Sequence, residues 1–520
     1  MAAPQTSIPV TAPGALGLNT KAESLDLGPF WSTEIKNAVV AADGTLGARK
    51  GWQKTFDTAI ESGADIKSIH EYIDSGGVSR IIYALNNKIY ESEVTPSEVT
   101  GTITTPTADN WKFVTFNNKC IGVQAGHAPI VKSDGGNFAD ISFDTAPSDP
   151  YEVLAAWGRV WYVDADKQTI KYSDLLQEDT MTTGSSGVLN MQTVWSTGSD
   201  EIVALAEFNN LLVVFGRKQV VIFSGGEDPN NELALVDIIT NTGCIARDSV
   251  QNLSADVLFL SEYGVISIAR SLETGSLPIS NVSENVANFL SLIIRSEPED
   301  NIKSVFNIED GYYLISFPTA NRTFYFTFRY LTDEGQETQD LSLKARVSKP
   351  RVSVWTDITP TAFGYTRSGD VLLGKEGLIG KYTGYQDNGE SYDFEFKTGW
   401  FSGQGQESTI KKIFKQAVNT IKSGFSVPVV FEWDYDYQPT AYGSAQNEVE
   451  AATSPSEFGI AEYGISEYTA SNYVSSLIYN MSGSGKTFRM GFRAVIDGAN
   501  LEIQKTELFI KTGKINRRGR

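Results

Sequence analysis

Short apolar runs separated by tight polar turns recur along most of this chain and limit what it can fold into. The most regular stretch is 202–270, where IVALAEFNNLLVVFGRKQVVIFSGG is followed, after a polar loop, by SVQNLSADVLFLSEYGVISIAR. Asn209-Asn210 splits one pair of runs, and Ser261-Glu262-Tyr263-Gly264 splits another. Runs rich in Val, Ile, Leu and Phe and bounded by Asn, Gly, Asp or Ser are typical of β-hairpins.

Similar hairpin units recur from Arg80 to Gly384. They lie at 80–93, 111–123, 152–174, the two halves of 202–270, 304–318 and 362–384. Their turns are roughly 30 to 60 residues apart, a period typical of propeller blades. No WD or kelch signature accompanies the repeat, and a series of β-sandwiches is the structural alternative. The spacing favours the propeller.

These patterns predict an all-β protein centred on a β-propeller of about six or seven blades, with a C-terminal β domain and few short helices. We expect an N-terminal arm and closing hairpin at 1–55, the propeller at 56–400 and the C-terminal β domain with a basic tail at 401–520. The N-terminal strand is a candidate for closing the last blade. Glu334–Lys349, which is polar with charges of both signs, is expected to be a long loop or projecting hairpin.

One segment departs from the strand pattern. SENVANFLSLIIRS, at 283–296, places Val286, Phe289, Leu290 and Ile293 on one helical face, and Pro298 follows it. We expect a helix packed on the sheets rather than a nucleic-acid recognition helix, because only Arg295 is basic.

The chain has 43 Lys and Arg against 63 Asp and Glu, a formal net charge of −20. Proteins that bind nucleic acid through its phosphates carry a basic surface, so this charge argues against conventional DNA binding. An acidic surface suits a conduit along which DNA slides without sticking, and it equally suits a soluble protein without that role.

Cys120 and Cys244 both lie in apolar runs, and two cysteines are too few for a disulfide framework. We expect buried free thiols and assembly in a reducing cytoplasm. The N-terminus, MAAPQTSIPVTAPGALGLNT, lacks the basic and apolar regions of a signal peptide. No apolar stretch approaches the roughly 20 residues that a membrane helix needs, so we expect no membrane insertion.

Charge is unevenly distributed near the C-terminus. Residues 423–485 contain no Lys or Arg, and the chain turns basic after them. The candidate lumen or interface charges are Glu432, Asp434, Asp436, Glu448 and Glu450, and the candidate docking tail comprises Lys511, Lys514, Arg517, Arg518 and Arg520. A solvated loop followed by a frayed terminus explains the same pattern.

Motifs for catalysis, cofactors or metals are weak. SGSGKT at 482–487 has Asn480 where a phosphate-binding loop needs glycine, and its flanks read as two strands, so a hairpin turn is favoured. His70 and His127 have no ligand-like spacing to a cysteine and are expected to be structural. Carboxylates are too numerous for a glycosidase pair to be chosen. We therefore expect no enzyme activity, cofactor or metal.

Several segments, taken in order, resemble the tail nozzle proteins of short-tailed phages, also called tail tubular protein B. The central resemblance comprises 202–226, Asp237-Ile238-Ile239, TGCIARDSV at 242–250, and 256–270. PGALGLNT and LDLGPFWSTEIKNAVVAADGTLGARKGW look like the family's opening. KYSDL at 171–175, IGKYTG at 379–384 and KTGKI at 511–515 fit as well.

The resemblance implies a non-enzymatic protein of the virion tail, assembled in the host cytoplasm. Such nozzles have a β-propeller and form a hexameric ring beneath an adaptor and portal. Genomic DNA passes through the ring without specific binding, and the ring gates its exit. The implied partners are further copies of the chain, the adaptor or portal ring above, tail fibres, and the host outer surface at the tip.

Two other functions fit the same residues. One is a carbohydrate-binding or glycan-degrading propeller for host-surface recognition, with Trp433, Tyr435 and Tyr437 stacking on sugars. The other is a scaffold propeller that binds protein partners and has no role in a virion.

Overall fold

The computed structural model describes residues 5–41, 44–92, 95–196, 198–253, 256–269, 281–328, 350–402, 412–424, 426–438, 441–449 and 473–512. The chain divides into two compact units. The propeller unit comprises 54–323 and 359–382, and the sandwich unit comprises 1–53, 324–358 and 383–520. These boundaries differ from the expected linear division at 55/56 and 400/401, because the sandwich unit draws on both ends of the chain.

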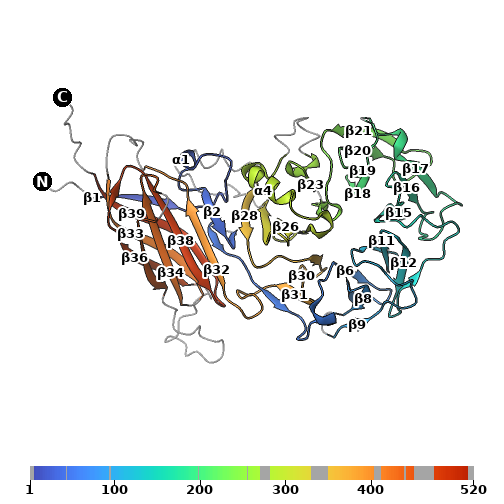
Figure 1. Ribbon diagram of the computed structural model, residues 1–520, viewed down its shortest axis with the longest axis horizontal. Coiled ribbons are helices and arrows are strands. Elements are labelled where there is room, and N and C mark those ends of the chain that lie inside the picture. Colours follow the sequence, from blue (N-terminus) through green and yellow to red (C-terminus); the bar gives the residue numbers. More distant parts are fainter. Residues whose placement is uncertain are drawn as a thin grey trace, which may run out of the picture. The chain divides into compact units, whose positions relative to one another are not determined.

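Seven small antiparallel sheets follow one another in sequence (Figure 1). The first three are β6–β9 (Ser68–Ile73, Ser79–Leu85, Lys88–Glu91, Ser97–Glu98), β10–β13 (Lys112–Phe116, Lys119–Gln124, His127–Ser133, Ala139–Asp140) and β14–β17 (Glu152–Ala156, Arg159–Val163, Thr169–Tyr172, Gly187–Asn190). The next two are β18–β21 (Ile202–Phe208, Leu211–Gly216, Gln219–Ser224, Ala234–Thr240) and β22–β24 (Gln251–Asn252, Val257–Ser261, Gly264–Ser267). The last two are β25–β28 (Lys303–Asn307, Tyr312–Phe317, Arg322–Thr327, Arg351–Trp355) and β29–β31 with β5 (Ala362–Tyr365, Val371–Lys375, Leu378–Tyr382, Trp52–Lys54).

The first strands of these sheets form a closed ring. β6 contacts β10, and contacts continue through β14, β18, β22, β25 and β29, which in turn contacts β6. Apolar cores lie between successive blades; one contains Trp161 and Val214, and another contains Phe215 and Phe259. A closed ring of antiparallel sheets is a β-propeller, here with seven blades. The fold class expected from the sequence is confirmed.

An N-terminal strand completes the last blade. The seventh sheet has the order β29-β30-β31-β5, so Trp52–Lys54 supplies its outermost strand. This pairing joins the beginning of the propeller sequence to its end.

Asn-Asn turns connect several inner hairpins, as the sequence predicts. Asn86 and Asn87 have φ values of 50° and 60°, and Asn209 and Asn210 have values of 48° and 63°. Two consecutive residues of positive φ form the type I′ turn that matches the twist of a β-hairpin, and asparagine tolerates this conformation.

Helical segments in the described part are short. They are α1 (Ser24–Leu27), η1 (Ile60–Gly63), η2 (Met191–Thr193), η3 (Arg247–Ser249), η4 (Glu284–Val286), α4 (Ala287–Ile294) and η5 (Glu299–Asn301). The helix expected at 283–296 is confirmed as η4 and α4, with Val286, Leu290 and Ile293 buried. The segment Glu334–Lys349 lies outside the described residues.

The sandwich unit contains two larger sheets. The first has the order β3-β4-β39-β33-β36 (Ala38–Val40, Leu46–Ala48, Leu501–Thr512, Lys412–Ser423, Tyr473–Asn480), with β1 (Gln5–Thr11) on β39 and β37 (Ser484–Gly485) on β33. The second has the order β2-β32-β38-β34-β35 (Ser32–Lys36, Tyr392–Thr398, Phe488–Ile496, Val427–Tyr435, Gly443–Val449). One apolar core takes residues from both sheets, including Phe396, Phe414 and Phe431. Two sheets around one core form a β-sandwich.

Arg49 fastens the N-terminal strands to the C-terminal part of the sandwich unit. Its side chain is fully buried, and its two terminal nitrogens donate to the Asp387 carboxylate at 2.8 and 2.6 Å. The guanidinium lies 4.0 Å from the ring centroid of Tyr392, and Nε donates to Asn37 Oδ1 at 3.1 Å. Arg49 belongs to the ARKGW segment of the family resemblance.

Cys120 and Cys244 are both free and buried, as expected. None of the helices in the described ranges is long and apolar enough to cross a membrane. The SGSGKT segment is flanked by two strands, as expected, but the hairpin expected there is wrong. β36 pairs with β33 in one sheet and β38 pairs with β32 and β34 in the other, so the segment crosses between the two sheets of the sandwich.

Candidate functional site

Charged side chains gather where the inner strands of the propeller converge. The short η3 segment supplies Arg247 and Asp248, and it immediately precedes β22, an inner strand of only two residues. Gly243 allows this segment to approach closely, because a Cβ atom there would lie 2.1 Å from the carbonyl carbon of Arg217. Ser249 Oγ donates to Ala246 O at 2.6 Å and accepts from the Leu260 amide at 3.0 Å, which fixes the turn.

Asp248 lies among three cations from three blades. Lys303 Nζ donates to Asp248 Oδ2 at 2.5 Å, and Arg247 donates to both carboxylate oxygens at 3.0 and 3.1 Å. Lys112 Nζ lies 3.7 Å from Oδ1. Burial acts to raise the pKa of Asp248, but the three cations outweigh burial and hold that pKa well below its ordinary value. Asp248 is therefore a carboxylate at neutral pH.

Arg247 extends this network to the second and third blades. Its guanidinium donates to the carbonyl oxygens of Tyr151 at 2.7 Å and Asn110 at 3.0 Å. Its Nε lies 3.8 Å from Glu152 Oε2. Glu152 is 1% exposed, and burial raises its pKa to about 7 despite the opposing effect of Lys112 and Arg247. Glu152 thus exchanges its proton near neutral pH.

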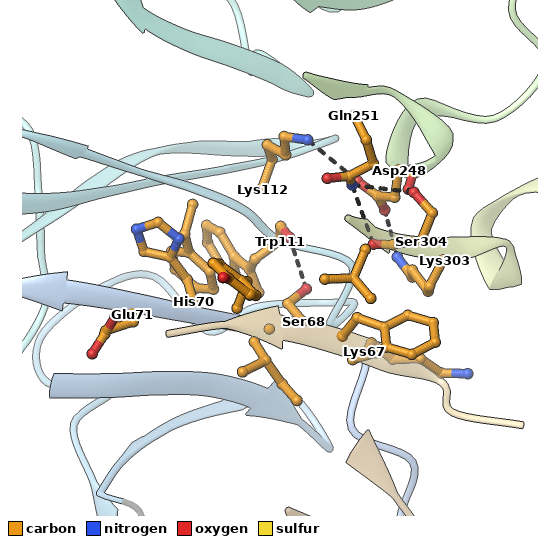
Figure 2. A pocket seen from close by; sticks show the side chains of 17 residues that line it. Lys67, Ser68, His70, Glu71, Trp111, Lys112, Asp248, Gln251, Lys303 and Ser304 are labelled. Carbon is orange, nitrogen blue, oxygen red and sulfur yellow. Dashed lines mark hydrogen bonds and ion pairs between the residues drawn. The ribbon is translucent and has the colours of Figure 1, made fainter. Parts of the chain in front are cut away.

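A cavity of about 270 Å³ opens beside Lys112 and Lys303 (Figure 2). Figure 2 shows these two lysines near Asp248, with His70 and Glu71 farther along β6. His70 Nε2 lies 2.9 Å from Thr115 Oγ1, and burial lowers the pKa of His70 to about 4. His70 is therefore neutral at pH 7, and it lines this cavity although the sequence indicated only a structural role.

His127, the other histidine, packs between strands. Its ring nitrogens lie 2.6 and 2.7 Å from the carbonyl oxygens of Ala128 and Thr104, and the side chain is 5% exposed. These contacts hold the ring in place, as expected for a structural histidine.

A second cavity, of about 290 Å³, lies on the Arg247 side of Asp248. It is lined by Gln124, Lys167, Arg217, Glu299 and Asp300, among others. The two cavities share Asp248, so the buried ion pairs separate them. The part of the chain that the structure describes has no group of three or more His, Cys, Asp or Glu side chains arranged to hold a metal ion.

The acidic residues singled out in the sequence lie in the sandwich unit. Glu432 and Asp434 lie on β34, where Glu432 is half-buried and Asp434 is only 3% exposed. Asp434 pairs with Arg489 at 2.7 Å, and Glu432 pairs with Arg493 at 3.1 Å. The two arginines come from β38, beyond the stretch without basic residues, so local sequence composition could not reveal these pairs.

The same sheet carries further cross-strand pairs. These are Lys36–Asp393 at 3.2 Å, Lys397–Glu34 at 3.0 Å and Arg489–Glu34 at 3.9 Å. Lys397 also lies 3.7 Å from Glu395 within the same strand, β32. Alternating charges across neighbouring strands stabilise the pairing of the sheet. This face is a ladder of opposite charges rather than an acidic surface.

The other charged residues singled out in the sequence do not form one cluster among the described residues. Asp436 accepts from the amides of Lys486 at 2.7 Å and Thr487 at 3.1 Å, which holds the β37–β38 turn. Glu448 accepts from Ser426 Oγ at 2.5 Å at an exposed position. Lys511 lies in β39 opposite Gln5 of β1. Glu450, Lys514, Arg517, Arg518 and Arg520 lie outside the described residues.

The aromatic residues considered for sugar stacking differ in exposure. Trp433 is 4% exposed and Tyr435 is 3% exposed, and both belong to the sandwich core. Tyr437 is 50% exposed. Of the three, only Tyr437 offers an accessible ring.

The axial cluster was not predicted from the sequence. Arg247 and Asp248 do leave a signal, because they interrupt the small and apolar residues of TGCIARDSV between two strand regions. Two adjacent charges in such a stretch indicate buried, paired groups. Their partners Lys112 and Lys303 lie far away in sequence and carry no comparable signal.

No family model matches this chain, and no curated protein matches it. Similar solved structures include a streptogramin B lyase (11% identity over 64% of this chain and 97% of the other, TM-score 0.38). The Pan2 WD40 domain of Neurospora crassa has 8% identity over 64% of this chain and 96% of the other, with a TM-score of 0.39. The computationally designed Ika8 protein has 12% identity over 64% of this chain and 99% of the other, with a TM-score of 0.34.

These likenesses are too low to carry an argument about function. The strand topology defines the class of protein: a seven-bladed β-propeller joined to a β-sandwich that contains strands from both ends of the chain.

Proposed function

We propose that this chain is a structural subunit of a short phage tail, a nozzle protein that assembles into a hexameric ring, conducts genomic DNA and gates its exit. The main support is the position of the segments that resemble this family. TGCIARDSV supplies the axial ion pairs of the propeller, and ARKGW supplies the buried Arg49 of the sandwich unit. The resembling segments thus build the interior of both units.

The geometry of the axis constrains where DNA would pass. Asp248, Lys303 and Arg247 fill the place where the inner strands converge, and the neighbouring cavities measure about 270 and 290 Å³. A DNA duplex, roughly 20 Å across, is far too wide for such cavities, since even its major groove is about 12 Å wide. The conduit must therefore form between copies of the chain, which is the reason for proposing a ring.

The net charge of −20 suits such a conduit. DNA phosphates are repelled by an acidic wall, so the genome slides without specific binding. Glu432 pairs with Arg493, and the buried Asp434 pairs with Arg489, so we propose interface rather than lumen charge for Glu432 and neither role for Asp434. The further proposed partners are the adaptor or portal ring, tail fibres, and the host outer surface at the tip, without membrane insertion.

The proposal is tested by imaging purified protein bound to a candidate adaptor ring. Six copies around an open channel wide enough for a duplex are expected. A monomer that does not bind any adaptor, or a ring whose channel is too narrow for DNA, would overturn it.

A further inference from the structure

Strand β21, Ala234–Thr240, forms the outer edge of the fourth blade (Figure 1), and that edge is open. Among the described residues, β20 is the one strand that pairs with it. The outer strands of the first three blades are shorter, since β9 and β13 have two residues each and β17 has four, whereas β21 has seven. Proteins usually keep open edges short, charged or covered, because their unpaired backbone N–H and C=O groups bind other strands.

The open edge carries exposed apolar side chains. Leu235 is 51% exposed and Val236 is 54% exposed, and Ile238 and Ile239 are half-buried. A bulge in the pairing with β20 lies at Val236, so the regular part of the edge begins at Asp237. The edge therefore offers backbone hydrogen-bonding groups directly beside accessible apolar surface.

The two faces of β21 differ in character. Ile238 lies opposite Val221, a residue of the apolar core between the third and fourth blades, and it packs against that core. Asp237 lies opposite Ile222, which belongs to the core between the fourth and fifth blades, so the carboxylate is on the other face. A strand paired with β21 places one set of alternate side chains beside Ile238 and the other set beside Asp237.

Carboxylates without ion pairs lie on β21 and on the connection that precedes it. Residues 219–246 contain no Lys, Arg or His, and their acidic residues are Glu227, Asp228, Glu232 and Asp237. Within the described part of the chain none of the four forms an ion pair, and the hydrogen bonds that three of them accept come from neutral groups. Asp237 Oδ1, for example, accepts from the Ile238 amide at 2.8 Å. This edge therefore attracts a basic partner.

We propose that β21 pairs with an extended segment of a partner polypeptide in which apolar residues alternate with Lys or Arg. Backbone hydrogen bonds along the edge supply affinity, and the alternate side chains supply specificity. The β21 strand of a second copy fits poorly, because it would bring the acidic residues of two chains together. This inference goes beyond the nozzle proposal, because it concerns the edge of one blade and requires neither a ring nor DNA.

Binding is measured by fluorescence anisotropy on the 520-residue chain with labelled heptapeptides. The main probe alternates valine with lysine. One control peptide has the same composition with its lysines grouped at one end, a second alternates valine with glutamate, and a third is the main probe with every backbone amide methylated. Hydrogen–deuterium exchange then locates the bound peptide on the chain.

Two exposed positions of β21 are changed, each with a matched control on another outer strand. Leu235→Ser is compared with Val188→Ser on β17, where Val188 is 57% exposed. Asp237→Lys is compared with Asp140→Lys on β13, which makes the same change in net charge at an exposed residue. Because all four positions are exposed, the variants should keep the thermal midpoint of the wild type.

We expect the alternating valine–lysine peptide to bind and to slow amide exchange within 234–240. The three control peptides should bind at least roughly tenfold more weakly, because each loses the alternation, the positive charge or the backbone hydrogen bonds. Leu235→Ser and Asp237→Lys should each weaken binding by roughly three- to tenfold, and the matched controls by less than roughly twofold.

Equal binding of the alternating and the grouped peptides would show attraction by net charge alone and would overturn the proposal. So would slowed exchange elsewhere in the chain instead of within 234–240, or no binding of any peptide to the wild type. Self-association that slows exchange within 234–240 without peptide would assign the edge to a second copy and overturn the proposed partner. Failure of ring assembly would leave the peptide results unaffected, because they are measured on one blade.

Discussion

Lys303 Nζ donates to Asp248 Oδ2 at 2.5 Å and so joins the inner strand β25 to the η3 segment of the preceding blade. Lys303 also donates to Asn110 Oδ1, next to β10. One lysine therefore connects three parts of the propeller at its axis, while β5 closes the ring at its periphery. The seven-bladed ring is therefore closed at its periphery by β5 and stabilised at its axis by ion pairs.

Replacement of Asp248 by Asn should strongly destabilise the propeller. The substitution leaves Arg247, Lys303 and Lys112 close together without the carboxylate, and removing one partner of a buried pair costs about 3–5 kcal/mol. Chemical denaturation checks this through the free energy of unfolding. Asp140→Asn, at an exposed edge strand, is the control. Equal denaturation midpoints for the Asp248 variant and the wild type would contradict the importance of the axial pairs.

The lowered pKa of Asp248 predicts that acid destabilises the propeller. Because the folded-state pKa of Asp248 is depressed, its contribution to stability is fully present above the ordinary aspartate pKa and is lost as pH falls toward the folded value. Wild-type stability should therefore decrease below about pH 4 through this group. Unfolding monitored between pH 6 and pH 3 should show a smaller loss in Asp248→Asn than in the wild type. An equal loss of stability in the variant and the wild type would show that Asp248 does not cause the acid sensitivity.

The raised pKa of Glu152 predicts the opposite effect: through this group, stability should decrease as pH rises toward neutrality. Its pKa rises from 4.5 to about 7 on folding, so the folded chain binds more protons than the unfolded chain between these values. Stability from this group is present at low pH and falls by up to about 3 kcal/mol as pH rises through 7. Glu152→Gln should lack this fall, and exposed Glu262→Gln should keep it. If the stability of Glu152→Gln depends on pH as that of the wild type does, the pKa of Glu152 is not raised.

Arg49 should not tolerate lysine. Lysine keeps the charge but loses the two-point contact with Asp387 and the contact of the guanidinium with the Tyr392 ring. We expect a loss of roughly 2–4 kcal/mol in the unfolding of the sandwich unit. The measurement is differential scanning calorimetry, with exposed Lys50→Arg as control. If Arg49→Lys has the same thermal midpoint as the wild type, the Arg49–Asp387 ion pair does not stabilise the attachment of the N-terminal strands.

The cysteines offer a direct check on the core. Burial raises the pKa of Cys120 far above its ordinary value, and it raises the pKa of Cys244 to about 12, so both remain unreactive thiols. A thiol reagent at pH 8 should label neither residue in the native chain and both after denaturation. Rapid labelling of native protein would mean that the blades open readily.

Local features of the fold were predictable from sequence. Asn86-Asn87 and Asn209-Asn210 mark hairpins because few residues accept positive φ, and apolar alternation marks the strands. The pairing of Gln5 with Lys511 was not predictable, because it joins two ends of the chain and depends on the sandwich core. Patterns within a strand do not specify such distant partners.

The candidate site was less predictable than the fold. Composition drew attention to Glu432 and Asp434, yet arginines on the neighbouring strand neutralise both. The axial cluster assembles from Asn110, Arg247 and Lys303, which come together only when the ring closes.

Mass in solution tests the central claim most directly. Light scattering on the 520-residue chain, alone and with a candidate adaptor ring, should give a closed assembly of six copies, since a homo-oligomeric conduit requires closed symmetry. Each copy has a mass of 56.8 kDa, so the ring is easily distinguished from a single chain. A monomer under both conditions would contradict the nozzle proposal and favour the propeller as a binding module acting alone.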